Sequence, residues 1–350
     1  MSDKTYHEQE TIDNTVALRT ILADMPVYVR TYFRGIEVNT ASRTRVGYAG
    51  DIKNFFEFML STNSSLKNKT FNDITLDVLN HLEAEDIEEY LEHLKYYVKD
   101  GKEYTNGERS IKRKLSALRN LYAYLYKNDK LTNNPIVKVN MPKIHDKAIV
   151  RMENNEVASF LDNVEYGNKL TKQQLVFHEK TKIRDLALLT LMLGTGIRVS
   201  ECVGLDIRDV DFDNERIKVV RKGGYESYVY FGTEVTTALL PYIEEREKIE
   251  PIEGHENALF LSSQRRRISV RAVEMLVKKY ALPVTPMKKI TPHKLRSTYG
   301  TSLYQETSDI YLVADVLGHS DVNTTKKHYA DIDQQRKRSA RNAVTLRENK

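Results

Sequence analysis

Residues 291–330 read TPHKLRSTYGTSLYQETSDIYLVADVLGHSDVNTTKKHYA, and this stretch decides how the rest of the chain is interpreted. It places His293 and Arg296 three residues apart, so on a helix both side chains share one face and can meet one anion. A guanidinium fork suits phosphate oxygens, and an imidazole exchanges a proton near neutral pH. His319 and Tyr329 follow, and a tyrosine in such surroundings is a candidate nucleophile. The stretch therefore predicts phosphoryl-transfer chemistry on a large phosphodiester.

Two further cations that suit this chemistry lie earlier in the chain. Arg198 follows a glycine turn after an apolar helical run at 182–193. Lys222 lies in the turn of a predicted β-hairpin whose strands are 216–221 and 225–231. Each cation alone is ordinary, as a surface ion pair or a solvated turn residue. Taken with residues 293–329, they predict one site in which two arginines bind nonbridging oxygens and a lysine protonates the leaving 5′-oxygen.

Protein cations can stabilise this reaction without a metal ion, and the sequence predicts neither a metal site nor a cofactor. The carboxylates are scattered, and the histidines do not have the spacing of metal ligands. Tyrosine has a pKa of about 10, so a nucleophilic tyrosine needs a cationic pocket. Cys202 is the only cysteine, which excludes a disulfide within the chain and fits a reducing cytoplasm.

The bulk composition allows two domains and a nucleic-acid partner. The chain has 350 residues, enough for two separate hydrophobic cores. Its net charge of +5 is mildly basic, so the placement of the charges matters more than their sum. No apolar run approaches the roughly 20 residues of a membrane span, and no span is predicted.

The fold is predicted to be mainly α, with a small antiparallel β-sheet in the C-terminal domain. Residues 1–15 look loose, and helical patterns then dominate up to residue 126. The segment 166–181 is expected to be irregular. Pro and Asn residues at 133–150 indicate a domain boundary. We therefore expect an all-helical domain at 1–140, a linker at 141–150, a catalytic domain at 151–332 and a tail at 333–350.

The helical pattern at 108–126 is basic along one side, which permits two interpretations. Such a charge run often belongs to the solvated face of a packed helix, but it can also lie against a phosphate backbone. The position just before the linker favours DNA contact. The candidates for DNA contact are Arg43, Arg45, Lys112, Arg113, Lys114, Arg119, Arg265, Arg266 and Arg267.

The motifs around these residues resemble those of the tyrosine recombinases, also called the phage integrase family. The matching motifs are GTGIRVSE with Arg198 and the supporting acid Glu201, RKGG with Lys222, HKLR with His293 and Arg296, LGH with His319, and KKHYAD with Tyr329. The resemblance covers the whole second half of the chain. The first half resembles the family's SAM-like core-binding domain, and its upstream aromatic segments resemble the single-recombinase Xer branch of low-GC Gram-positive bacteria.

The resemblance implies a two-domain clamp around duplex DNA and a 3′-phosphotyrosyl intermediate formed by Tyr329. It implies a homo-tetramer on two DNA sites that exchanges strands through a Holliday junction, and a monomer or dimer when free of DNA. The segment 334–346 is expected to dock on the neighbouring subunit. The resemblance also implies a bacterial, cytoplasmic, nucleoid-associated enzyme that resolves chromosome dimers and so serves chromosome partition and cell division.

Two departures from the Xer pattern are present; the first is not at a core chemical position, and the second keeps another function open. Ser297 follows Arg296 where relatives often have His, and the spacing from His319 to Tyr329 is one residue longer, as in conjugative-transposon integrases. The main alternative is therefore an integrase or excisionase of a mobile element. A type IB topoisomerase-like enzyme and a non-catalytic DNA-binding protein are further alternatives. The sequence leaves the DNA target and any accessory protein unidentified.

Overall fold

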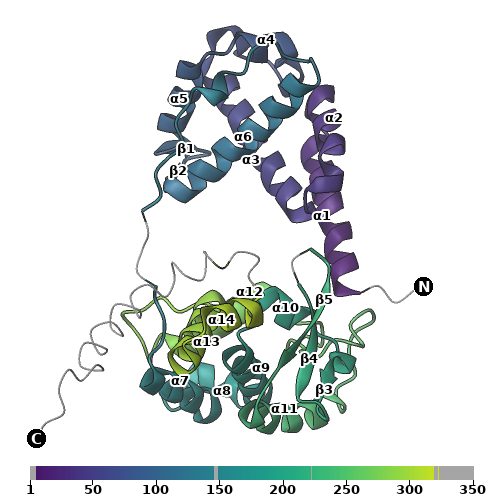
Figure 1. Ribbon diagram of the computed structural model, residues 1–350, viewed down its shortest axis with the longest axis vertical. Coiled ribbons are helices and arrows are strands. Elements are labelled where there is room, and N and C mark those ends of the chain that lie inside the picture. Colours follow the sequence, from purple (N-terminus) through teal and green to yellow (C-terminus); the bar gives the residue numbers. More distant parts are fainter. Residues whose placement is uncertain (1–4, 146–148, 222, 319–321, 323–350) are drawn as a thin grey trace, which may run out of the picture. The chain divides into compact units, whose positions relative to one another are not determined.

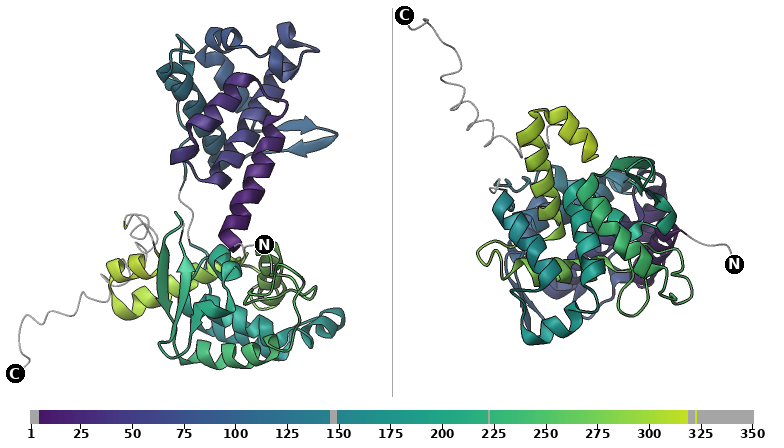
Figure 2. Two further views of the ribbon diagram at one scale, coloured as in Figure 1. Left: turned by 90° about the vertical axis from the view of Figure 1, so that its right-hand side faces the viewer. Right: turned by 90° about the horizontal axis from the view of Figure 1, so that it is seen from below.

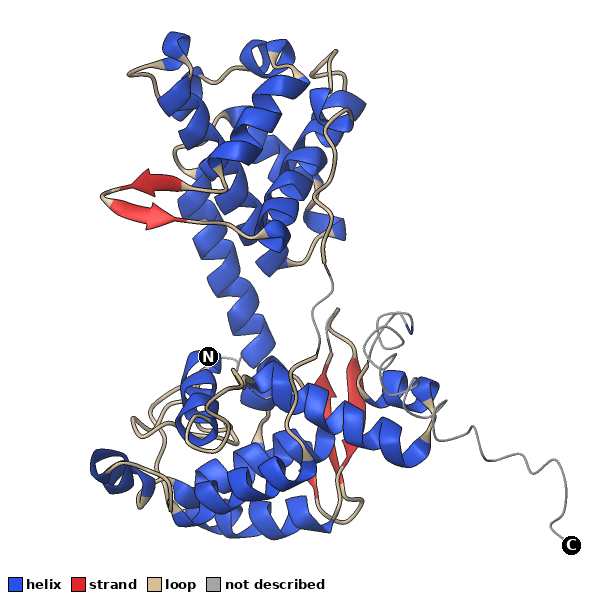
Figure 3. Ribbon diagram, turned by 90° about the vertical axis from the view of Figure 1, so that its left-hand side faces the viewer, coloured by secondary structure: helices blue, strands red, loops and turns tan. Residues whose placement is uncertain are grey.

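The chain forms two compact units, Met1–Lys147 and Ala148–Lys350 (Figure 1). A computed structural model describes residues 5–145, 149–221, 223–318 and 322. The first unit is built mainly from helices, and the second combines helices with a small sheet (Figure 3). The structure thus confirms the predicted mainly helical fold with an antiparallel sheet in the second half of the chain.

The first unit buries an aromatic core between its helices. Helix α1 packs against α3, and both α3 and α2 pack against α6. Tyr32, Phe55, Phe56, Tyr90 and Tyr122 are almost fully buried, and aromatic side chains of this size contribute most to the energy of a core. The elements of this unit are α1 (Tyr6–Leu22), α2 (Val27–Gly35), α3 (Ser42–Thr62), α4 (Leu76–His81), α5 (Ala84–His93), β1 (Tyr97–Lys99), β2 (Lys102–Tyr104) and α6 (Glu108–Lys127).

Two expectations for the first unit are wrong. Residues 6–15 belong to α1, because Thr5 and Glu8 form a reciprocal capping box that starts the helix early. The unit is also not all-helical, because β1 and β2 form an antiparallel hairpin around Asp100 and Gly101, both at positive φ. An Asp-Gly pair favours this tight turn. Figure 2 shows the hairpin projecting from the helices of its unit.

A buried charge cluster joins α3 to α6 in this unit. Asp51 on α3 lies between Arg113 and Lys114 of α6, and the Lys114 ammonium also lies 3.0 Å from the side-chain oxygen of Asn54. Burial raises the pKa of Asp51 and lowers the pKa of Lys114, although each partner acts in the opposite direction. Removal of one member would leave a buried charge without its partner, so the cluster is sensitive to the loss of any member.

The second unit is organised around helix α9 (Lys182–Thr195). Helices α11, α13 and α7 all pack against α9, and the residues Leu188, Leu189, Leu191 and Met192 of α9 are almost fully buried. The other helices are α7 (Asn154–Tyr166), α8 (Lys172–His178), α10 (Val199–Gly204), α11 (Thr233–Arg246), α12 (Val270–Ala281), α13 (Pro292–Thr307) and α14 (Ile310–Val316). Helix α8 corrects the expected irregular segment, because Thr171 and Gln174 cap its start.

A three-stranded antiparallel sheet with the order β3-β4-β5 completes the second unit. Its strands are β3 (Val210–Asp211), β4 (Arg216–Val220) and β5 (Glu226–Tyr230). The β4–β5 hairpin confirms the predicted strand pair, with Ile217 opposite Val229 on the buried face. Across the described ranges, no helix is long and apolar enough to cross a membrane.

We expect Asp51→Ala to destabilise the first unit, because it leaves Lys114 buried without its counter-charge. Loss of one partner from a buried ion pair costs about 3–5 kcal/mol. Hydrogen exchange of peptides from α3 and α6 in the full-length protein measures this loss. Lys99→Ala is the control, since it breaks an exposed 2.8 Å pair with Glu57 that contributes about 0–1 kcal/mol. Equal effects of the two substitutions would contradict the importance of the buried cluster.

Candidate active site

The loop between α9 and α10 places Arg198 beside Glu201. Arg198 is the N-cap residue of α10. Its backbone N–H donates to the Glu201 carboxylate at 2.8 Å, and its guanidinium Nη1 donates to the same carboxylate at 2.7 Å. Glu201 is buried, whereas the Arg198 side chain stays 30% exposed. The buried carboxylate therefore orients an arginine that can still reach a ligand.

Helix α13 brings Arg296 to the same region. Thr291 precedes the helix and Pro292 begins it, a position at which proline costs no hydrogen bond. The buried Arg296 guanidinium donates to the Gly196 carbonyl at 2.6 Å and to the Leu317 carbonyl. His293 lies one helical turn earlier and is exposed. The structure thus places Arg198, Glu201 and Arg296 in one site, with His293 in the first turn of α13.

The C-terminal end of α14 is the point on which the arginines converge. The carbonyls of Val316, Leu317 and Gly318 accept hydrogen bonds from Arg221, Arg296 and Arg198, respectively. The last carbonyls of a helix lack partners within it and carry partial negative charge, so guanidinium donors stabilise this end. Gly318 has a φ of +60°, a conformation that glycine adopts without strain.

The cluster of four charged side chains has an excess of positive charge. The guanidinium groups of Arg198, Arg221 and Arg296 supply three positive charges, and the Glu201 carboxylate supplies one negative charge. Arginine in such a protected site attracts the nonbridging oxygens of a phosphodiester more strongly than it does in water. The arrangement can therefore stabilise the charge that gathers on a phosphoryl group under attack.

Three predicted site residues, Lys222, His319 and Tyr329, lie outside the described residues. Their neighbours in the chain are described. The Arg221 backbone N–H donates to the Tyr225 carbonyl at 2.9 Å where the β4–β5 hairpin turns, and Gly318 ends the α14 turn just before residue 319. The roles assigned to these three residues stay predictions.

Arg221 is a site residue that the sequence reasoning missed. It is buried, and its guanidinium contacts both Glu201 and the Val316 carbonyl. A signal was available in the alternation of strand β4, because Ile217 and Val219 face inward and residue 221 continues that face. A charged residue at such a position needs a buried partner.

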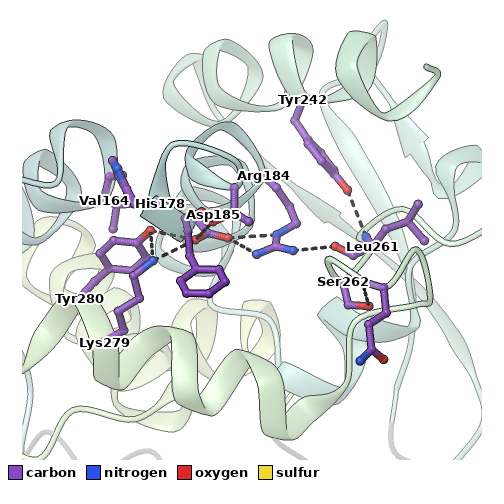
Figure 4. Close-up of polar contacts among 12 residues, drawn as sticks. Val164, His178, Arg184, Asp185, Tyr242, Leu261, Ser262, Lys279 and Tyr280 are labelled. Carbon is purple, nitrogen blue, oxygen red and sulfur yellow. Dashed lines mark hydrogen bonds and ion pairs between the residues drawn. The ribbon is translucent and has the colours of Figure 1, made fainter. Parts of the chain in front are cut away.

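A second polar cluster, centred on Asp185, is structural. Asp185 is fully buried and accepts hydrogen bonds from Arg184, from Thr181 at 2.9 Å and from the Tyr280 hydroxyl at 2.8 Å, as Figure 4 shows in part. Burial raises the pKa of the Tyr280 hydroxyl and lowers the pKa of Lys279. The cluster ties the start of α9 to the end of α12.

Among the residues that the structure describes, none of the His, Cys, Asp and Glu side chains form a group of three or more suited to hold a metal ion. The candidate site is built instead from arginine donors and one carboxylate. These groups bind an anion rather than a cation.

The candidates for DNA contact fall into two groups. Arg43, Arg113, Arg265 and Arg266 are exposed and Lys112 is half-buried. In this group Arg113 pairs with Asp51 and Arg43 with Glu10, but both side chains stay exposed. The other four are less exposed and have donors engaged within the protein: Arg45 with Glu37, Lys114 with Asn54 and Asp51, Arg119 with the Val139 carbonyl, and Arg267 with the carbonyls of Val203 and Leu205. The exposed group is therefore better placed to meet phosphates.

Two parts of the sequence match described protein families. Residues 150–336 match the phage integrase family, and residues 29–129 match the N-terminal SAM-like domain of phage integrases. The chain is 33% identical to the tyrosine recombinase XerS of Streptococcus uberis, over 90% of this chain and 94% of that protein.

Two solved structures share the fold. The XerH site-specific recombinase bound to its difH substrate matches with a TM-score of 0.61 and 22% identity, over 89% of this chain and 81% of that one. The Tn1549 transposon integrase in complex with circular intermediate DNA matches with a TM-score of 0.62 and 23% identity, over 91% of this chain and 100% of that one. At these identities the two structures establish the fold alone.

We expect Gly196→Ala to disturb the site, because Gly196 has a φ of +63° and a Cβ there would lie 2.4 Å from the Tyr299 ring. The clash adds about 1–3 kcal/mol to the cost of the left-handed backbone. Thermal unfolding of the full chain measures the effect. Gly254→Ala is the control, since its φ is +83° but no atom lies within 4 Å of the added Cβ. If both variants unfold at the same temperature, the contact with Tyr299 does not contribute to the loss of stability.

Proposed function

The chain belongs to the phage integrase family of tyrosine recombinases, and we propose that it is the single Xer-type recombinase that resolves chromosome dimers. It is a DNA-cleaving and DNA-rejoining enzyme that performs site-specific recombination of the Xer type. The observation that supports the chromosomal role is the likeness, over nearly the whole chain, to proteins named tyrosine recombinase XerS. The same role places the enzyme in the bacterial cytoplasm, associated with the nucleoid.

The proposed reaction begins with attack by Tyr329 on one phosphodiester of duplex DNA. The tyrosine oxygen loses its proton and bonds to phosphorus, the bond from phosphorus to the 5′-oxygen breaks, and Lys222 protonates that oxygen. Arg198 and Arg296 bind the nonbridging oxygens in the transition state, while His293 and His319 add hydrogen bonds or move a proton. The 3′-phosphotyrosyl bond keeps the energy of the broken bond, so rejoining needs no ATP.

We infer an assembly of four protomers on two DNA sites, with strands exchanged through a Holliday junction. The domain at 1–140 and the catalytic domain at 151–332 would both contact the duplex. The tail at 333–350, and within it 334–346, would dock on the neighbouring subunit in a heterologous contact that closes into a ring. Outside DNA the protein would be a monomer or dimer.

A mobile-element role is the second candidate, because the spacing from His319 to Tyr329 resembles that of conjugative-transposon integrases. Selection of genomic fragments that the protein binds, followed by recombination between them, separates the two roles. One chromosomal site shared by all bound fragments supports dimer resolution. Sites at the two ends of a mobile element would favour the alternative.

We expect Tyr329→Phe to abolish the covalent protein–DNA adduct, because the substitution removes the attacking oxygen. The assay uses a selected site carrying a nick near the cleavage position, which traps the adduct. Tyr311→Phe is the control, since Tyr311 is 68% exposed on α14 and should keep adduct formation. A wild-type adduct without recombinant products would indicate a topoisomerase-like enzyme. Specific binding without any adduct would indicate a non-catalytic DNA-binding protein.

We expect Arg265→Ala to weaken DNA binding at low salt and to reduce the slope of log Kd against log salt by about 1, as loss of one phosphate contact does. Arg265 is exposed in the turn after Leu261. Lys182→Ala serves as the control, because the Lys182 side chain is 40% exposed but pairs with Glu179. An unchanged slope for Arg265→Ala would remove this residue from the DNA interface.

A further inference from the structure

Arg221 links the β4–β5 hairpin to two other parts of the site. Its side chain is buried, with Nη1 3.3 Å from the Glu201 carboxylate and Nη2 3.0 Å from the Val316 carbonyl. Its backbone N–H donates to Tyr225, and its own carbonyl accepts from Gly224 at 3.0 Å. One residue therefore joins the base of the hairpin turn, the carboxylate that orients Arg198 and the end of α14.

Glu201 alone would have opposing effects on Arg198. Its carboxylate oxygen Oε1 orients the Arg198 guanidinium at 2.7 Å, but the negative charge also cancels the charge that should attract a phosphate. Arg221 contacts the other oxygen of the same carboxylate, Oε2. The three side chains together carry two positive charges and one negative charge. With Arg221 present, Glu201 orients Arg198 and the group still has one net positive charge.

The backbone around Arg221 leaves room for this arrangement. Gly318 has no side chain, and a Cβ at that position would lie 3.0 Å from the Arg221 Cζ atom. The guanidinium therefore packs directly against the Gly318 backbone, whose carbonyl accepts from Arg198 at 3.0 Å. Arg221 and Arg198 thus bind adjacent parts of one helix end as well as one carboxylate.

We propose that Arg221 is a positioning residue for Arg198, acting through Glu201 to maintain both the orientation and the net positive charge with which Arg198 meets the scissile phosphate. This inference rests on the proposed recombination reaction. It predicts a defect in the chemical step that depends on the charge of the phosphate. A residue that only stabilises the fold would slow the cleavage of any substrate equally.

The test compares two substrates in single-turnover adduct formation by the full-length protein at saturating enzyme. One is the selected DNA site with a normal scissile phosphodiester. The other carries a methylphosphonate there, in which a methyl group replaces one nonbridging oxygen and removes the negative charge. The variants are Arg221→Met, which removes the charge, and Arg221→Lys, which keeps it. Arg216→Met is the matched control. Arg216 lies on the same strand but forms a 2.9 Å ion pair with Asp211, and neither residue belongs to the site.

We expect Arg221→Met to slow cleavage of the phosphodiester by roughly 10- to 100-fold, with the Kd for DNA unchanged, because transition-state stabilisation is lost. On the methylphosphonate the defect should shrink to about threefold or less, since little charge is left to stabilise. Arg221→Lys should fall between wild type and Arg221→Met. Adding Glu201→Gln to Arg221→Met should restore part of the rate, because it removes the uncompensated carboxylate. Arg216→Met should cleave both substrates like wild type.

An equal defect of Arg221→Met on both substrates overturns the inference and assigns Arg221 to the fold alone. A weaker Kd with an unchanged cleavage rate also overturns it. If Arg221→Met unfolds at a much lower temperature, Arg221→Lys is used in its place. A defect of Arg221→Lys that is larger on the phosphodiester than on the methylphosphonate supports the inference, and an equal defect on both substrates overturns it. Absence of any adduct from wild-type protein bound to its selected site would instead contradict the proposed function, and the inference with it.

Discussion

The arrangement of the site in the second unit depends on three arginines, Arg198, Arg221 and Arg296, that donate hydrogen bonds to the C-terminal end of α14. Three consecutive carbonyls, those of residues 316–318, each accept a hydrogen bond from a different arginine. These arginines come from the end of β4, from α13 and from the start of α10, so the helix end fixes three separate elements at one point. A helix C-terminus can do this because its last carbonyls have no partners within the helix. The same contacts leave the partly exposed Arg198 guanidinium where a phosphate could meet it, with the buried Arg221 and Arg296 adding positive charge behind it.

Burial of Glu201 gives this arrangement its electrostatic character. A carboxylate removed from water must be paired, and Arg198 and Arg221 supply the pairing. The surplus positive charge is then held by the protein before any substrate arrives. Little reorganisation is needed when charge develops on a phosphoryl group, and this preorganisation is a main source of catalytic rate. The Asp185 cluster separately ties the start of α9 to the end of α12.

Particular residues show how far the sequence predicted this structure. The motifs around Arg198 and Arg296 predicted a shared site from residue types and order, and the structure brings the two arginines to one helix end. The β4–β5 hairpin followed from alternation and a glycine-rich turn. The capping boxes at Thr5 and Thr171 start helices in segments whose apolar pattern predicts none, and the β1–β2 hairpin lies in a region with a dominant helical pattern. The charge of α6 and its position before the linker predict DNA contact for Lys114, whereas the structure buries Lys114 against Asp51 and Asn54.

The sequence by itself determined the fold class and predicted the cations and the candidate nucleophile, because these depend on residue types at fixed spacing and on periodic patterns. Tertiary structure alone decided which charges face a ligand and which are used within the protein. Arg221 and Lys114 look alike in sequence as basic residues beside other basic residues, yet one completes the site and the other stabilises the core of the first unit. Burial and hydrogen-bond partners come from segments far apart in the chain, and no local pattern encodes them.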